Sequence, residues 1–126
     1  MIQSRDLTYK YQGGPQIRFP DFQVASGEVL LILGESGCGK TTLLHLLAGL
    51  RRPTTGQIKL DQQQLTDLPS NALDQFRGQN IGMVYQQSYF IEALSIEENL
   101  LLSPYVVDKQ RATSIANKLG IGDQLK

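Results

Sequence analysis

Apolar residues of this chain gather in short runs, and the pattern of each run predicts an element. Residues 29–33 and 81–85 are almost continuously apolar, which is typical of strands buried on both faces. Apolar and polar residues alternate more loosely in residues 2–9, 17–24 and 57–60, which predicts half-exposed strands. Because only a short turn separates the first two of these strands, we expect an antiparallel opening to the fold.

Four other segments have the apolar spacing or the boundary residues of helices, namely residues 42–50, 69–77, 95–102 and 108–119. Ser70 is placed to cap the second of these helices. Ser95 and Glu98 match a capping box, so we interpret this pair as a helix start rather than as a pair for acid–base chemistry. Gly120 predicts the end of the last helix. Residues 61–64 are polar and predict a turn.

The overall composition limits the classes of protein to which this chain can belong. Its 126 residues suffice for one domain, or part of one, with a real core. The 12 basic and 12 acidic residues balance, so no basic field predicts a nucleic-acid partner. No apolar stretch approaches the roughly 18 residues that span a bilayer, and the first residues do not resemble a signal peptide. We therefore expect a cytoplasmic position without direct membrane insertion. The single cysteine, Cys38, excludes an internal disulfide.

A glycine-rich motif directly follows the apolar run at residues 29–33. Residues 34–41 match G-x-x-x-x-G-K-[ST], the pattern of a phosphate-binding loop. The glycines let successive backbone N–H groups point at phosphate oxygens, and the helix that follows adds its own free N–H groups. Lys40 would reach the β- and γ-phosphates, and Thr41 would offer a hydroxyl to Mg²⁺. The nucleotide-binding residues that we predict here are Gly34, Glu35, Ser36, Gly37, Cys38, Gly39, Lys40, Thr41 and Thr42.

Two further features resemble the ATP-binding domains of ABC transporters, and the resemblance covers essentially the whole chain. Tyr11 lies 23 residues before the first glycine of the loop, where the family has an aromatic residue that stacks on adenine. Tyr9 is the competing candidate for this role. Residues 81–87 are similar to the family's Q-loop, with Gln86 at the glutamine position and Gln87 as the competing neighbour. In the family this amide reaches Mg²⁺ or the attacking water.

The resemblance implies an α/β fold of the P-loop NTPase class, of the ABC type. It divides the chain into an N-terminal antiparallel β subdomain (residues 1–30 and 56–65), a P-loop core (29–50 and 81–86) and the start of a helical subdomain (87–126). The family's signature sequence, its Walker B aspartate with the catalytic glutamate and its switch histidine have no match in this sequence. We therefore interpret residues 1–126 as the N-terminal portion of one ABC ATP-binding domain, with the C-terminal half of the domain absent from this chain.

The function that the resemblance implies is that of an ATP-binding subunit of an ABC transporter, an ATPase that couples MgATP hydrolysis to transport. Lys40 and Gln86 would be catalytic, Thr41 and Gln86 would hold Mg²⁺, and Tyr11 would bind the base. The partners would be a second ATP-binding domain, in a head-to-tail dimer, and membrane-spanning subunits at the inner face of a membrane. Without the glutamate base, this chain alone would bind ATP without efficient turnover.

The sequence leaves some finer points and competing functions open. Residues 65–68 and 76–77 resemble, more weakly, the branch of the family that extracts lipoproteins or exports macrolides. A non-transport ABC-type half-domain would lead into a coiled coil, yet residues 108–126 show no sustained heptad. A nucleotide-binding module without turnover is a third hypothesis, and a P-loop kinase or GTPase is a fourth. Because the strands at 29–33 and 81–85 would lack neighbours, the ABC interpretation also predicts self-association or a rearranged core.

Overall fold

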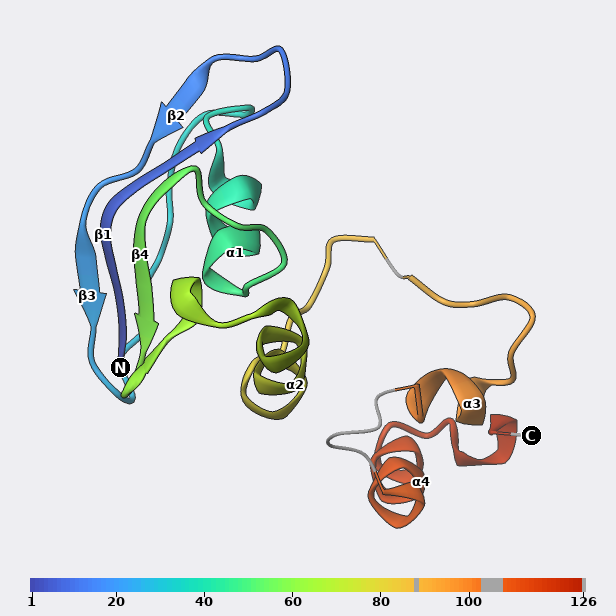
Figure 1. Ribbon diagram of the computed structural model, residues 1–126. Coiled ribbons are helices and arrows are strands. Elements are labelled where there is room, and N and C mark those ends of the chain that lie inside the picture. Colours follow the sequence, from blue (N-terminus) through green and yellow to red (C-terminus); the bar gives the residue numbers. More distant parts are fainter. Residues whose placement is uncertain (88, 103–107, 126) are drawn as a thin grey trace. The chain divides into compact units, whose positions relative to one another are not determined.

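The computed structural model describes residues 1–87, 89–102 and 108–125, and it divides the chain into two units, Met1–Asp74 and Gln75–Lys126. Figure 1 shows the first unit with a sheet and the second with helices joined by irregular segments. No helix of the described residues has the length and apolar character needed to cross a membrane.

Among the described residues, five antiparallel strands form one sheet, with the order β2-β1-β4-β5 and with β3 also paired to β1. The strands are β1 (Ile2–Lys10), β2 (Gln16–Arg18), β3 (Phe22–Val24), β4 (Thr55–Leu60) and β5 (Gln63–Gln64). The long strand β1 pairs with β4 along one edge and with both β2 and β3 along the other (Figure 1). The antiparallel opening predicted from the sequence is therefore confirmed.

Two details of the sheet differ from the prediction. The single strand expected at residues 17–24 is two strands, β2 and β3, because Pro20 has no N–H to offer a neighbour. The polar turn expected at residues 61–64 is shorter, because Gln63 and Gln64 pair with β4. Asp61 makes the tight reversal with a φ of 51°, a left-handed conformation that aspartate tolerates better than most residues.

Strand β1 carries an irregularity in its middle. The register between β1 and β4 shifts between Arg5 and Thr8, and Asp6 adopts a φ of 47°. Gly56 lies opposite with a φ of 89°, and a Cβ there would collide with the backbone carbonyl oxygens of Asp6 and Arg5. Such a bulge inserts an extra residue into one strand, and here only glycine fits beside it.

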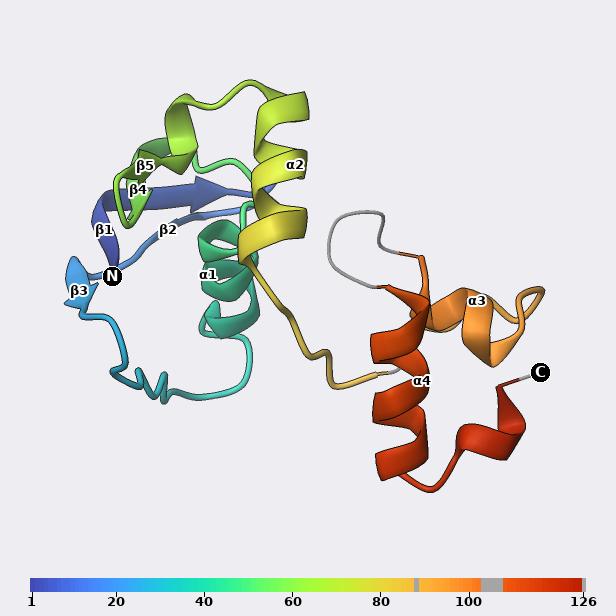
Figure 2. The same cartoon turned by 90° about the horizontal axis from the view of Figure 1, so that it is seen from below.

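Helix α1 (Lys40–Leu47) provides the apolar layer of the first unit. Its buried residues are Thr42, Leu43, Leu46 and Leu47, and Figures 1 and 2 show the helix lying against one face of the sheet. From the sheet, Leu7 and Ile58 are 0% and 1% exposed, so the core of this unit lies between the sheet and α1. Burial of large aliphatic side chains of this kind is the main stabilising contribution.

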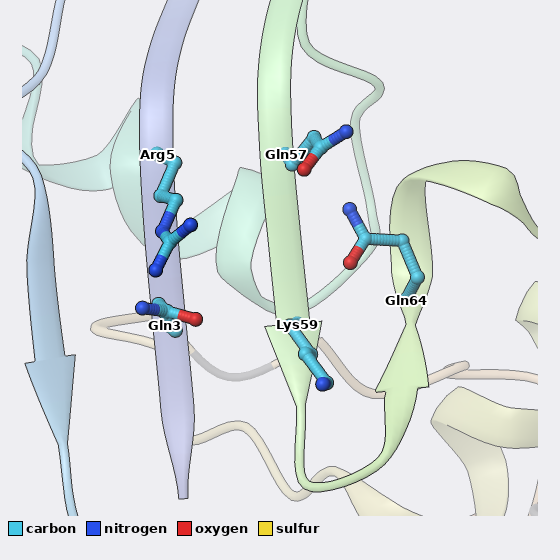
Figure 3. A pocket seen from close by; sticks show the side chains of 5 residues that line it. All are labelled: Gln3, Arg5, Gln57, Lys59 and Gln64. Carbon is cyan, nitrogen blue, oxygen red and sulfur yellow. The ribbon is translucent and has the colours of Figure 1, made fainter.

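The opposite face of the sheet is polar. Side chains alternate between the two faces of a strand, so the neighbours of the buried Ser4 and Ile58 project away from the core. These four neighbours, Gln3, Arg5, Gln57 and Lys59, surround a depression of about 270 Å³ together with Gln64 of β5 (Figure 3). One apolar and one polar face are what an antiparallel sheet covered on a single side requires.

Glycine ends helix α1. Gly49 has a φ of 67°, its N–H donates to the carbonyl of Leu46 at 3.0 Å, and the N–H of Leu50 donates to the carbonyl of His45 at 2.8 Å. These two bonds form a Schellman motif. The helix predicted at residues 42–50 therefore begins two residues earlier, at Lys40, and ends at Leu47.

A short 3-10 helix, η1 (Leu65–Asp67), leads to helix α2 (Ser70–Asn80), which crosses the boundary between the two units. The prediction of a helix at residues 69–77 is confirmed, and the helix continues three residues further. Ser70 is its first helical residue rather than its N-cap, because the carbonyl of Pro69 already accepts from the N–H of Leu73 at 2.9 Å. The cap prediction was therefore one residue off.

The second unit contains helices α3 (Ile96–Leu100) and α4 (Lys109–Lys118) and the 3-10 helix η2 (Gly122–Gln124). The capping box is confirmed, since the Ser95 N–H donates to Glu98 Oε2 at 2.8 Å and the Glu98 N–H donates to Ser95 Oγ at 3.2 Å. Helix α4 is capped by Asp108, whose Oδ1 accepts from the Arg111 N–H at 2.6 Å. Its end at Gly120, with a φ of 73°, follows the prediction.

The two apolar runs predicted as buried strands are not strands in the structure. In the first run Val29, Leu31 and Leu33 are 94%, 75% and 80% exposed, and in the second Val84 is fully exposed. A strand is stable only when another strand satisfies its backbone groups, and no described segment pairs with either run. The prediction of strands in the P-loop core was therefore wrong for the described structure, while self-association through these runs stays a prediction.

Candidate nucleotide-binding site

The glycine-rich loop forms a tight reversal that leads directly into helix α1. Gly37 and Gly39 adopt φ values of 82° and 104°, which are unfavourable for residues with a side chain. The Cys38 N–H donates to the Glu35 carbonyl at 3.3 Å. A Cβ on Gly39 would approach the Phe19 ring to 3.3 Å, so glycine also lets the helix start pack against the end of the sheet.

The start of helix α1 presents its free N–H groups at this loop. Gly39 is the N-cap residue, and it has no side chain that could cap the helix. The first N–H groups of a helix lack intrahelical partners, and together with the helix dipole they favour an anion. The loop and the helix start thus offer donors to a negatively charged group.

Lys40 supplies a positive charge over the same loop. Its Nζ donates to the carbonyl oxygens of Gly34 and Glu35 at 2.8 and 2.7 Å, and Cys38 Sγ lies 3.8 Å away. The loop therefore wraps around the ammonium group. This set of donors, with one ammonium and several backbone N–H groups, fits the oxygens of a phosphate chain.

The two threonines that follow have different environments. Thr41 is exposed, so its hydroxyl is an oxygen donor open to solvent, whereas Thr42 is 5% exposed. Among the described residues, no group of three or more His, Cys, Asp or Glu side chains could hold a metal ion. A metal at this loop would therefore depend on the Thr41 hydroxyl and on oxygens of the ligand itself.

Tyr11 lies beside the start of helix α1. Its hydroxyl and Thr42 Oγ1 are 2.8 Å apart and share a hydrogen bond. The Tyr11 ring is nearly perpendicular to that of Tyr9, with centroids 4.8 Å apart. Tyr11 is 40% exposed, whereas Tyr9 is half-buried. The structure therefore brings the predicted aromatic residue and the predicted phosphate loop together, and of the two tyrosines Tyr11 is the more accessible.

Arg51 contacts both Tyr11 and Tyr9, and the sequence did not predict that this residue belongs to the candidate site. Its guanidinium carbon lies 5.4 Å from the centroid of the Tyr11 ring and 5.6 Å from that of Tyr9, and its Nη1 donates to the Tyr9 hydroxyl at 2.8 Å. The signal in the sequence was Gly49, because a glycine-terminated helix turns the chain back toward the strands.

Gln86 belongs to the second unit, and its position relative to the loop is therefore not part of the described structure. It lies in an irregular segment after the exposed run at residues 81–85, and both Gln86 and Gln87 are exposed. The structure does not distinguish between these two amides, and their roles stay predictions.

Comparison with known proteins assigns the family. A family model described as ABC transporter matches residues 18–126, most of the chain. The chain belongs to the ABC transporter family. Within this family, it is 33% identical over 135 aligned positions to the lipoprotein-releasing system ATP-binding protein LolD of Idiomarina loihiensis, covering 99% of the chain and 59% of that protein. The LolD protein of Chromohalobacter salexigens is 36% identical, with 96% of the chain and 55% of that protein covered.

Solved structures of the ABC family agree. The dimeric structure of MJ0796, a bacterial ABC transporter cassette, matches with a TM-score of 0.79 and 28% identity, over 94% of this chain and 55% of that one. A second MJ0796 structure, of a post-hydrolysis state bound to ADP and Pi, matches with the same TM-score. The ABC-type fold class predicted from the sequence is therefore confirmed. The chain spans a little over half the length of these relatives.

Proposed function

We propose that this chain is the MgATP-binding portion of the ATP-binding subunit of an ABC transporter. One observation carries the proposal: the Lys40 ammonium group lies within the glycine-rich loop, bonded to the carbonyls of Gly34 and Glu35, at the uncapped start of helix α1. These groups form one cluster of donors suited to a triphosphate. The residues proposed to bind the nucleotide are Gly34, Glu35, Ser36, Gly37, Cys38, Gly39, Lys40, Thr41 and Thr42, with Tyr11 at the base.

Tyr11 would provide the platform for adenine. The hydrogen bond between its hydroxyl and Thr42 supports this role, because it ties the exposed ring to the helix whose N-terminus would hold the phosphates. Stacking on an aromatic face needs no hydrogen-bond code, so affinity for the base would be moderate and tolerant of other purines.

Lys40 and Gln86 would be the catalytic residues of this chain in the complete domain, and Thr41 and Gln86 would hold Mg²⁺. Chemistry of this class depends on positioning and on stabilising the charge of the γ-phosphoryl group. A positioned base contributes about 10²- to 10⁴-fold, and this sequence offers no matching Asp-Glu pair after Gln86. We therefore expect this chain to bind MgATP and to turn it over slowly.

The likeness to LolD proteins supports a place in a transporter complex. The proposed partners are membrane-spanning subunits and a second ATP-binding domain in a head-to-tail dimer. The dimeric structure of the MJ0796 cassette supports the pairing of two such domains. The proposed location is the inner face of a membrane. The LolD likeness favours the lipoprotein-releasing branch, which the segments at residues 65–68 and 76–77 resemble.

Titration calorimetry with MgATP tests the proposal. Lys40→Ala removes charge-assisted bonds to phosphate, each worth roughly 1.5–3 kcal/mol, so we expect an affinity loss of about 10-fold or more. Lys59→Ala is the matched control, because Lys59 lies on the polar face of the sheet away from the core (Figure 3). Unchanged affinity for Lys40→Ala, or an equal loss for both variants, would refute the proposed site.

A further inference from the structure

Arg51 is held in place by its own backbone. Its N–H donates to the carbonyl of His45 at 3.2 Å, just after the Schellman motif that ends helix α1. The guanidinium of the adjacent Arg52 lies against a different segment and donates to the carbonyls of Thr66 and Leu68 at 3.3 and 2.6 Å. The two neighbouring arginines therefore have separate tasks, and of the two it is Arg51 that faces the tyrosines.

The Arg51 side chain contacts both rings of the tyrosine pair. Its guanidinium lies within cation–π range of the Tyr11 and Tyr9 rings, at 5.4 and 5.6 Å from their centroids. The same group donates a hydrogen bond to the Tyr9 hydroxyl at 2.8 Å. Tyr9 in turn meets Tyr11 edge to face. Arg51 thus fixes the Tyr11 ring directly and also through Tyr9.

Three contacts now restrain the Tyr11 ring: the Thr42 hydroxyl, the Tyr9 ring and the Arg51 guanidinium. An exposed tyrosine that was free to change rotamer would lose that freedom when a base stacked on it, and the loss would weaken binding. A ring held in advance avoids this loss, and Tyr11 keeps 40% of its surface accessible for a ligand.

We infer that Arg51 is a positioning residue for recognition of the nucleotide base, acting through Tyr11 and Tyr9. The inference rests on the proposed function, since it assigns a role within the same nucleotide site. It predicts that Arg51 strengthens binding of the purine ring beyond the general attraction that any positive charge exerts on the triphosphate.

The test compares two ligands, MgATP and magnesium tripolyphosphate, in calorimetric titrations of the full chain. Tripolyphosphate lacks the base and the sugar, so the ratio of its Kd to that of ATP isolates the contribution of the nucleoside. Removal of a positive charge weakens the binding of every polyanion, and it weakens tripolyphosphate at least as much as ATP, because tripolyphosphate carries the larger negative charge. This general effect raises the ratio, so it cannot account for a decrease. We expect Arg51→Gln to lower the ratio about two- to fivefold, the size of a cation–π contact at an exposed site.

Three further variants separate the role of the Arg51 side chain from general effects of substitution. Tyr9→Phe removes only the hydroxyl that accepts from Arg51, so it should lower the ratio by a smaller factor without loss of the fold. Arg51→Lys keeps a cation and should restore part of the ratio. Arg18→Gln is the control, because Arg18 is 78% exposed and forms a 3.6 Å ion pair with Asp6; its ratio should equal that of the wild type.

The outcomes separate this inference from the proposed function. If the wild type binds neither ligand, the proposed function falls and the inference with it. If the wild type binds both ligands and Arg51→Gln leaves the ratio unchanged, the role of Arg51 is refuted while the phosphate site stands. A lower stability of Arg51→Gln with an unchanged ratio would likewise show a purely structural residue.

Discussion

Replacement of Gly56 by alanine should strongly destabilise the first unit, and the structure allows the effect to be divided into two parts. The φ of 89° at Gly56 lies in the left-handed region, which costs a residue with a Cβ about 1–2 kcal/mol. The new Cβ would also lie 2.5 Å from the Arg5 carbonyl oxygen and closer still to that of Asp6. Both obstacles are backbone atoms that cannot rotate aside, so β1 and β4 must move apart. Strain of this kind typically costs a further ~1–3 kcal/mol.

Gly13 provides the matched control for this prediction. Its φ of 73° is also left-handed, yet a Cβ there would meet nothing within 4 Å. Gly13→Ala should therefore show the conformational cost alone, about 1–2 kcal/mol. Urea unfolding followed by far-ultraviolet circular dichroism measures both variants. The reasoning about the collision fails if Gly56→Ala is no less stable than Gly13→Ala.

Two predictions concern the second unit. The hydrogen bonds from the Ser95 N–H and hydroxyl hold the pKa of Glu98 below its usual value of 4.5. The ionised Glu98 carboxylate therefore stabilises the start of helix α3 above pH 4.5, and this stabilisation is lost as the pH falls through the lowered pKa. Cα chemical shifts of residues 96–100 should therefore report weakening of helix α3 in acid, and Glu98→Gln should remove this pH dependence. The prediction fails if the wild-type shifts do not change with pH, or if Glu98→Gln shows the same change. Gly120→Ala should lower the free energy of unfolding by about 1 kcal/mol, because Gly120 has a φ of 73° with open space around it. Urea denaturation checks this value, and a stabilised variant would count against the helix end described here.

Local signals in the sequence predicted the helices well. The capping box at Ser95 and Glu98 and the stop at Gly120 rely on neighbouring residues alone, and both are confirmed. The antiparallel opening likewise depends on short turns between adjacent segments. Such features need no information from distant parts of the chain, which explains their success.

Features that depend on distant partners were harder to predict. The runs at residues 29–33 and 81–85 have strand composition, but composition does not show which segment supplies the backbone partner, and no described segment does so. In the candidate site, the glycine-rich loop could be predicted from the sequence because its eight positions are contiguous. Arg51 was not, because its approach to Tyr9 and Tyr11 depends on the turn at Gly49 and on the packing of α1 beside the sheet.

The irregularity in β1 also decides which side of the sheet carries aromatic residues. Gln3 and Arg5 project to solvent, and in an unbroken zigzag every second residue after them would do the same, including Leu7, Tyr9 and Tyr11. The extra residue at the shift reverses this parity, so that Leu7 enters the core and Tyr11 reaches Thr42. A regular zigzag through Asp6, with no residue removed, would therefore carry both tyrosines to the other side of the sheet, away from the loop, although every residue of the nucleotide site would still be present in the sequence. Deletion of Asp6 would instead leave the tyrosines on their present side.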